Sequence, residues 1–249
     1  MPTTSEKRAE FRRLHESGFF IIPNAWDVGS AVRLTRLGFK AIASTSAGAA
    51  WAVGKEDGQM SRDEVLAHLR TLADATPLPV NADFENGFAD DPSDVAANVA
   101  MAVETGVAGL SIEDWSGTAM YEVSLAVDRI AAARAAIDAI DPAVMLIGRN
   151  ENFRVKDMPV RESIDRAIAY ANAGADCLFV PFLLDQGAVA ELVAAVAPKP
   201  VNVVVHDYDE TIRAFADLGV RRCSVGASLA GRVWASFDEA ATALRRAEP

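Results

Sequence analysis

One order of hydrophobic and polar positions repeats along the chain: an alanine-rich helical stretch, a glycine, a short apolar run, and a polar loop that opens the next helical stretch. Gly38, Gly106, Gly174 and Gly219 each fit the position just after a helix end, where glycine takes a positive φ without a Cβ clash. The pattern therefore predicts helices and strands in alternation along the whole chain.

The apolar runs number eight, and each predicts a strand. They are continuously apolar rather than alternating, which is typical of parallel strands buried on both faces. Eight strand–helix units predict an α/β fold, a closed (β/α)8 TIM-type barrel in a single domain over residues 1–249, with residues 1–18 as a leading helix across one end. An open doubly wound sheet is the alternative, but the chain has no Gly-x-Gly-x-x-Gly or P-loop motif to favour it. The expected strands lie near residues 19–23, 40–44, 78–83, 108–112, 143–148, 176–181, 200–205 and 221–225.

Composition narrows the choice of partners and compartment. The net charge of −11 disfavours nucleic acid and anionic membranes as partners, because affinity for phosphates comes from clustered Lys and Arg. Apolar runs such as residues 177–184 are shorter than the roughly 20 residues that a bilayer span requires, and the first residues lack the apolar centre of a signal peptide. We expect a cytoplasmic protein. Cys177 and Cys223 lie in apolar runs and are interpreted as reduced core residues.

Acidic residues end two neighbouring apolar runs, Asp83 and Glu85 after one and Glu113 and Asp114 after the next. In a barrel of this kind the active groups gather at the carboxyl ends of the strands. Asp83 and Glu85 would share a strand face with Cβ atoms roughly 6.6 Å apart. That spacing suits a hydrated Mg²⁺, with one carboxylate bound directly and the other through a coordinated water. Solvated loop acids are the alternative interpretation.

Arg149 ends another apolar run and is the clearest test of a catalytic site. A guanidinium at a barrel mouth is costly unless it meets an anion, and its planar fork suits a carboxylate or an enolate oxygen. A structural ion pair with Glu113 or Glu151 is the alternative. Polar or aromatic residues also follow the other runs, namely Asn24, Trp26, Asp27, Thr45, Ser46, Pro181, Phe182, His206 and Asp207.

This ordered set resembles the isocitrate lyase/phosphoenolpyruvate mutase superfamily from about residue 18 to residue 245. Residues 82–88 match its Asp-x-Asp-x-Gly-Tyr-Gly metal motif, with Glu85 in place of the second Asp and Ala89 in place of the last Gly. Four other segments match in the expected order: an opening strand and loop, a carboxylate-binding turn, an Ile-Glu-Asp motif, and an Ala-Arg-Thr-Asp motif, at residues 23–31, 44–48, 112–114 and 148–151.

The resemblance implies a lyase that depends on Mg²⁺, with Mn²⁺ as the alternative ion. It would cleave a carbon–carbon bond of a small 2-oxo or 2-hydroxy (di)carboxylate through a stabilised enolate. Asp83 would bind the metal, with Glu85, Glu113 and Asp57 on its waters, and Arg149, Glu113 and Glu85 would act in catalysis. The substrate would be bound by Trp26, Thr45, Ser46, Ala47, Asp83, Arg149, Asn202 and His206. For Trp26, filling of the barrel end is the alternative, and for His206 a capping or surface role.

The resemblance also implies a homodimer that exchanges a C-terminal helix, or a homotetramer built from such dimers. The corresponding segment here is an alanine-rich helix from about residue 236 to residue 246. It could equally pack on its own barrel.

One departure from the superfamily limits the reaction. Its isocitrate and methylisocitrate lyases carry a mobile Lys-Lys-Cys-Gly-His loop, but residues 115–122 contain no Cys, Lys or His. We therefore do not expect those two cleavages, nor the phosphonate mutase reaction. Cleavage, hydrolysis or decarboxylation of an oxaloacetate-like acid remains. Tyr121 is either a proton donor or a packing residue. Two rival classes stay open: a non-catalytic barrel that binds a 2-oxo acid, and a class II aldolase.

Overall fold

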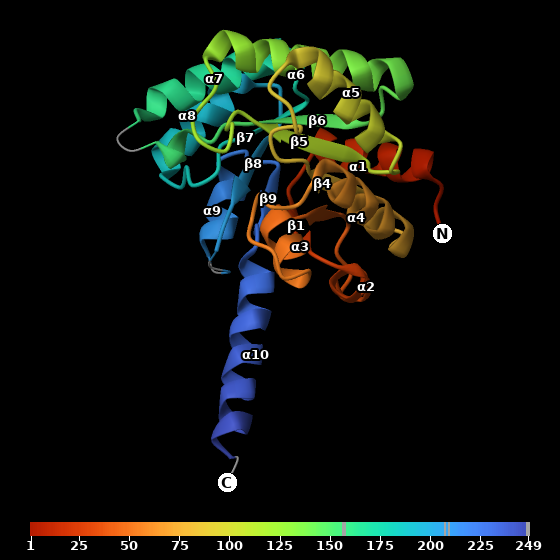
Figure 1. The fold of residues 1–249 in the computed structure, drawn as a ribbon. Coiled ribbons are helices and arrows are strands. Elements are labelled where there is room, and N and C mark those ends of the chain that lie inside the picture. The colour runs from red at the N-terminus through yellow and green to blue at the C-terminus, as the bar shows by residue number, and fades with distance from the viewer. Residues whose placement is uncertain (156–157, 207, 209, 248–249) are drawn as a thin grey trace.

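Parallel strands form a ring at the centre of the molecule, with helices packed around it (Figure 1). The computed structural model describes residues 1–155, 158–206, 208 and 210–247. The ring confirms the predicted TIM-type barrel. Its hydrogen-bonded order is β1-β9-β8-β7-β6-β5-β4-β3-β2. The strands are β1 (Phe20–Ile22), β2 (Asn24–Ala25), β3 (Ile42–Ser44), β4 (Val80–Asp83), β5 (Gly109–Glu113), β6 (Met145–Arg149), β7 (Cys177–Phe179), β8 (Val201–Val204) and β9 (Arg222–Ser224).

The first expected strand is divided at Pro23, so that eight predicted runs give nine strand segments. β1 pairs with β9 on one side and β2 pairs with β3 on the other, and the two segments together close the ring. Asn24 links the two sides of this closure. Its Nδ2 donates to the Ser44 carbonyl at 2.7 Å, and its Oδ1 accepts from the Val225 N–H at 3.0 Å.

Helices follow the strands in the expected alternation, and several carry side-chain caps. Ser61 and Glu64 form a capping box at the start of α4, and Asp91 caps α5 with Pro92 in its first turn. A 3₁₀ turn covers Asn152–Arg154. The helices are α1 (Thr4–Glu16), α2 (Val28–Arg36), α3 (Ser46–Ala52), α4 (Arg62–Ala75), α5 (Pro92–Val103), α6 (Val123–Ile140), α7 (Val160–Asn172), α8 (Gln186–Val196), α9 (Thr211–Asp217) and α10 (Ser228–Arg246).

Helix α1 closes the amino-terminal end of the barrel. Lys7 donates to the Ala73 and Thr76 carbonyls at 2.7 and 2.6 Å, ahead of β4. The Phe11 ring packs directly under Gly109, where an added Cβ would come within 2.7 Å of a ring carbon. Because this end is sealed, ligands must enter from the carboxyl ends of the strands.

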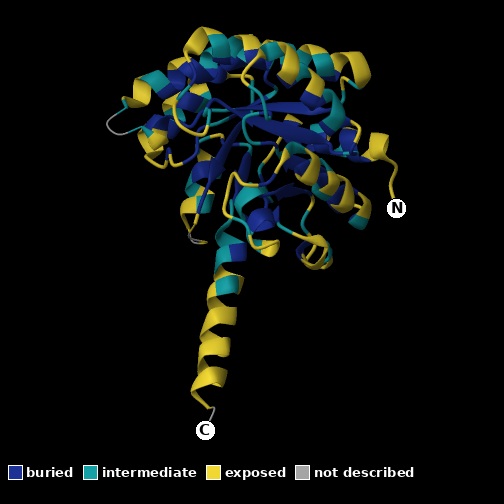
Figure 2. Cartoon of the chain, in the orientation of Figure 1, coloured by how far each residue is buried: buried dark blue, intermediate teal, exposed yellow. Residues whose placement is uncertain are grey.

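The buried residues form two layers, one between the strands and the helices and a smaller one inside the barrel. Figure 2 shows the strands as mostly buried. The interior is only partly apolar, because several polar side chains also point into it. The buried polar residues that line the interior cavity are Asn24, Ser44, Asn81, Ser111, Asn202, Arg222 and Ser224.

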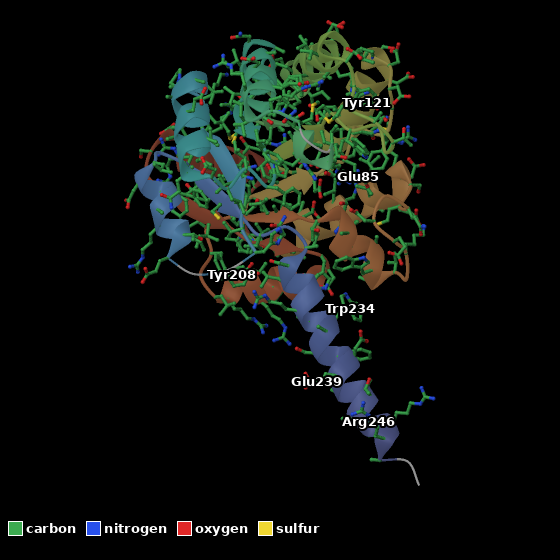
Figure 3. All side chains as sticks on the ribbon, turned by 90° about the vertical axis from the view of Figure 1, so that its left-hand side faces the viewer. Glu85, Tyr121, Tyr208, Trp234, Glu239 and Arg246 are labelled. Carbon is green, nitrogen blue, oxygen red and sulfur yellow. The ribbon has the colours of Figure 1, made fainter. Side chains whose placement is uncertain are left out.

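Helix α10 leaves the barrel and projects away from it (Figures 1 and 2). Its apolar residues Val233, Phe237 and Leu244 are exposed, whereas Ala230 near its start is buried. Figure 3 shows Trp234, Glu239 and Arg246 spaced along this projecting segment. In the described part of the chain, no helix has both the length and the hydropathy to cross a membrane.

Candidate active site

A cavity of about 240 Å³ opens at the carboxyl ends of the strands and runs down into the barrel. A second recess, of about 370 Å³, lies beside it under the loops that follow β4 and β5. Ser46, Asp57, Arg149 and Arg154 line both. The two hollows therefore share one mouth, with a basic pair between them.

Arg149 lies at the centre of this mouth because it is the last residue of β6. Its Nη1 donates to Asp83 Oδ1 at 3.0 Å and lies 3.2 Å from Glu113 Oε2, and its Nε donates to Glu151. Burial lowers the pKa of Arg149, but the carboxylates of Glu113, Glu151 and Asp83 outweigh it and raise the pKa above its usual value. The guanidinium therefore stays charged.

Glu85 lies in the loop after β4, in a left-handed backbone conformation with φ of 46°. Its Oε1 is buried and has no hydrogen-bond partner in the described structure. Burial raises its pKa to about 8, and the negative charges of Asp83, Asp57 and Glu113 add to this effect. Burial also raises the pKa of Glu113, although Arg149 opposes the shift. This side of the mouth holds more negative charge than its arginines balance.

The residues of the mouth fit a hydrated divalent cation. An orphaned carboxylate oxygen and two raised carboxyl pKa values are expected where a cation belongs. The available donors are carboxylate oxygens, which Mg²⁺ and Mn²⁺ prefer. Among the described residues, however, no three His, Cys, Asp or Glu side chains converge as ligands of one metal ion. The arrangement therefore suits an ion that keeps several of its waters, with exposed Asp57 at the outer rim.

The turn that opens α3 forms one wall of the cavity. Thr45 Oγ1 accepts from the Gly48 N–H at 3.4 Å, and the Ser46 N–H donates to Asp83 Oδ2 at 3.0 Å. No hydrogen bond of the Ala47 N–H is found in the described structure. Thr45 thus caps the helix, Ser46 holds the metal-side carboxylate, and Ala47 has a backbone donor to offer.

Asn202 and His206 lie at opposite depths of the cavity, and Trp26 lies outside it. Asn202 is buried on β8, where its Nδ2 donates to Ser224 Oγ at 3.0 Å. His206 is exposed at the rim and stacks on Phe182, with ring centroids 5.9 Å apart. Trp26 does not line either hollow, and its Cβ lies against the backbone of Gly48 instead. Of the expected site residues, Trp26 is the one that lines neither of the two hollows.

Asp114 faces away from the mouth although it follows Glu113 directly. Its carboxylate accepts from the Tyr170 hydroxyl, from Asn150 Nδ2 at 2.8 Å and from the Glu151 N–H at 2.8 Å. Successive strand residues point to opposite faces, so only one of this acidic pair can reach the substrate. Asp114 therefore positions Glu151, which in turn holds Arg149.

Two arginines that line the cavity, Arg154 and Arg222, are not among the site residues expected from the sequence. Arg154 bonds to Glu151 Oε2 at 2.7 Å, and Arg222 lies deep in the barrel. Arg222 is the first residue of β9, whereas the active groups of such barrels are expected at the carboxyl ends of the strands. A charged residue at an inward position of a buried strand was the available signal.

Residues 115–122 form a short, ordered loop over the second recess. Trp115 and Met120 form an antiparallel bridge, and Trp115, Ser116 and Gly117 line the recess. Tyr121 donates its hydroxyl hydrogen to Asp90, and burial raises its pKa to about 12. Asn86, the residue after Glu85, donates from its Nδ2 to the Tyr121 hydroxyl at 3.2 Å, but Tyr121 lines neither hollow.

Comparison with known proteins agrees with this geometry. A family model described as phosphoenolpyruvate phosphomutase matches residues 11–245. The 2-methylisocitrate lyase of Salmonella typhimurium is 32% identical over 202 residues, or 76% of this chain and 66% of that protein. A lyase/mutase-type structure from Burkholderia cenocepacia has a TM-score of 0.94 at 41% identity, and the match covers 98% of this chain and 90% of that one. Oxaloacetate acetylhydrolase in complex with its product oxalate has a TM-score of 0.89 at 25% identity, with 98% and 88% covered.

Proposed function

This chain belongs to the phosphoenolpyruvate phosphomutase family, within the isocitrate lyase/phosphoenolpyruvate mutase superfamily, and we propose that it is a Mg²⁺-dependent lyase of small 2-oxo or 2-hydroxy dicarboxylates. It is an enzyme of the carbon–carbon lyase type found in that superfamily. The substrate, the metal and the exact reaction are the parts that we propose.

One observation carries the proposal: Arg149 meets Asp83 and Glu113 at the same mouth where Glu85 presents a buried carboxylate oxygen that has no partner among the described residues. An enolate-forming site needs positive charge beside the reacting oxygen, because negative charge develops on that oxygen in the transition state. A fixed guanidinium and a group of carboxylates that can bind a cation meet this need. The same pairing weakens the case for a non-catalytic binding barrel. A class II aldolase is disfavoured because His206, the histidine at the rim, bonds to none of these acids.

Bond cleavage in a 2-hydroxy acid begins when the hydroxyl loses its proton to a base, for which Glu113 is our candidate. The C–O bond becomes a carbonyl, the neighbouring C–C bond breaks, and its electron pair moves onto the other fragment as an enolate that is later protonated. Arg149 lies beside Glu113 and would stabilise the oxyanion. The Ala47 N–H and the Ser46 hydroxyl, on the cavity wall, would orient the substrate carboxylate.

Mg²⁺, when bound, would supply electrostatic stabilisation of the developing negative charge. Asp83, Glu85 and Glu113, with Asp57 at the rim, are the residues that would hold it. Asp83 is already oriented from both sides, by the Ser46 N–H and by Arg149. Hydrogen bonds of this kind fix the orientation of a carboxylate that binds a metal ion.

Hydrolysis of an oxaloacetate-like acid is the second candidate. Water would add to the keto carbon of such an acid, the bond between C2 and C3 would break, and the departing enolate would take up a proton. The loop at residues 115–122 has no Cys, Lys or His for that step, so water would supply the proton. Oxaloacetate acetylhydrolase shares the fold over 98% of this chain. Decarboxylation of the same acid would form the same kind of enolate.

The test is turnover of 2-hydroxy and 2-oxo diacids by the purified chain with and without Mg²⁺, with products identified by NMR. A lyase releases two fragments that include a carbonyl compound, the hydrolase releases oxalate and acetate from oxaloacetate, and a decarboxylase releases CO₂. Turnover that does not change when EDTA removes all divalent metal would contradict the proposal. The Arg149→Met variant serves as the inactive reference.

A further inference from the structure

Arg222 is a charged side chain at the bottom of the barrel cavity. It is 3% exposed, it begins β9, and it lines the same hollow that opens at Arg149. A buried guanidinium needs an anion or full hydrogen bonding to offset its lost hydration. Its partners therefore decide what the residue does.

Every partner of Arg222 among the described residues is neutral. Nε donates to Asn202 Oδ1 at 3.0 Å, and Nη1 lies 3.2 Å from Asn81 Oδ1 and 3.3 Å from His15 Nε2. His15 is uncharged, because burial lowers its pKa to about 3 and the charge of Arg222 lowers it further. Its Nδ1 contacts the Phe11 carbonyl at 2.7 Å, which leaves Nε2 as the acceptor.

No carboxylate lies within ion-pair distance of Arg222 in the part of the chain that the structure describes. Arg149, by contrast, has three. The Arg222 Nη2 makes no hydrogen bond with a described residue, yet it is not sealed from solvent. One donor of a buried positive charge is thus open to the cavity.

The depth of Arg222 below the mouth suits a short diacid. Its partner Asn81 lies two residues before Asp83 on β4, and two strand residues span about 6.6 Å. A diacid of roughly four or five carbons, at about 1.5 Å per bond, bridges such a gap. The wall of the same cavity includes the apolar side chains of Ile22, Ala43 and Phe179, which suit methylene groups.

We propose that Arg222 is a subsite for the second carboxylate of the substrate, bound at the barrel floor while the reacting end is held at Arg149. The inference rests on the proposed function for the reacting end and adds the recognition of the far end. Asn202, which bonds both Arg222 and Ser224, positions the guanidinium. A monoacid of equal length would leave the buried charge unpaired and would bind more weakly.

Binding of two matched acids tests the subsite without turnover. Isothermal titration calorimetry in MgCl₂ compares 2-oxoglutarate with 2-oxopentanoate, which has the same chain length and one carboxylate fewer. We expect the wild type to prefer the diacid at least tenfold, which corresponds to about 1.4 kcal/mol. Arg222→Met and Arg222→Gln should both abolish this preference. Arg221→Met is the control, because the neighbouring Arg221 donates to the Gly18 carbonyl and does not line the cavity.

Stability separates recognition from a structural role. Removal of an uncompensated buried charge should leave the unfolding temperature of Arg222→Met equal to or above that of the wild type. A lowered unfolding temperature with the diacid preference intact, in either variant, would overturn the subsite. A wild type that turns over diacids but binds both acids equally would overturn the subsite and leave the proposed function standing. A tenfold preference for the diacid without turnover would overturn the proposed function and leave the subsite standing. Binding of neither acid would overturn both the subsite and the proposed function.

Discussion

The backbone N–H of Glu113, the last residue of β5, donates to the carbonyl of Glu85 in the loop after β4 at 2.9 Å, so the main chain holds these two acids together. Both carboxyl groups have raised pKa values, because each is buried and each lies near other acids. The fold therefore holds several acidic groups close together, and their mutual repulsion lowers the stability of the folded state. Such an arrangement is expected at a site that receives a cation.

The charge on Glu85 should destabilise the metal-free protein as the pH rises. The folded state keeps the Glu85 proton up to about pH 8, whereas the unfolded chain releases it near pH 4.5. The free energy of unfolding should therefore fall between these values. Glu85→Gln should raise it by about 2 kcal/mol at pH 8 and change it little at pH 5. Urea unfolding in EDTA at pH 5 and at pH 8 measures the free energy of unfolding of the wild type and of the variant. Glu56→Gln, at an exposed position, is the control.

Metal affinity should follow the opposite trend with pH. A cation binds the ionised carboxylate, so binding must displace the proton that Glu85 holds below about pH 8. The dissociation constant for Mg²⁺ should rise by about tenfold for each pH unit below that value, which means that binding becomes weaker. Calorimetry between pH 6 and pH 9 should show proton release on binding. A dissociation constant independent of pH in this range would remove Glu85 from the metal site.

Replacement of Arg149 should abolish turnover rather than substrate binding alone. Arg149→Met removes the charge that faces the developing oxyanion, and we expect kcat to fall by about 10² to 10³. Arg149→Lys should not restore it, because a lysine cannot contact Asp83, Glu113 and Glu151 together. Steady-state kinetics provides the measurement. Near-normal kcat in the lysine variant would reduce Arg149 to a structural ion pair.

Tyr121 should prove to be a packing residue. Its hydroxyl is bonded to Asp90, and the Arg129 guanidinium lies 4.1 Å from the centre of its ring. Tyr121→Phe should lower the free energy of unfolding by about 1 kcal/mol and change kcat less than threefold. Thermal unfolding and kinetics on the same sample check both. A large loss of kcat with unchanged stability would instead make Tyr121 the proton donor.

Association of the chain should depend on the exposed apolar residues of α10. We expect a homodimer or homotetramer in which this helix packs on a second copy, since Phe237 is 60% exposed and Leu244 is 76% exposed. Phe237→Asp should shift the sedimentation profile toward monomer. Ser236→Asp adds the same charge at the adjacent exposed position and should leave the profile unchanged. Equal profiles for the wild type and Phe237→Asp would exclude this surface.

The apolar runs predicted the barrel because each run ends within two residues of the end of its strand, and the mouth residues follow from that. Arg149 and Asp83 could be placed in this way, and their contact follows from neighbouring strand ends. Side-chain direction was harder to predict. Asp114 bonds Tyr170, 56 positions away, and the sequence contains no mark of that pairing.

The environment of Arg222 could not be predicted for a related reason. It depends on His15, which lies 207 residues earlier and comes under the barrel only when α1 docks. Trp26 follows a strand as the site residues do, yet it lines neither hollow, and its Cβ lies against Gly48. Local pattern fixes where a strand ends, whereas tertiary packing decides which way each side chain turns.

The break at Pro23 has a consequence for how copies of this molecule can meet. β1 is bonded to β9 and β2 is bonded to β3, so each half of this divided strand has one partner, and the strand taken as a whole is paired on both sides. The described sheet therefore presents no full-length free edge. Unpaired edges are the usual templates for fibril growth and strand addition. Self-association must therefore proceed through helical surfaces, and aggregation should require that the ring first open.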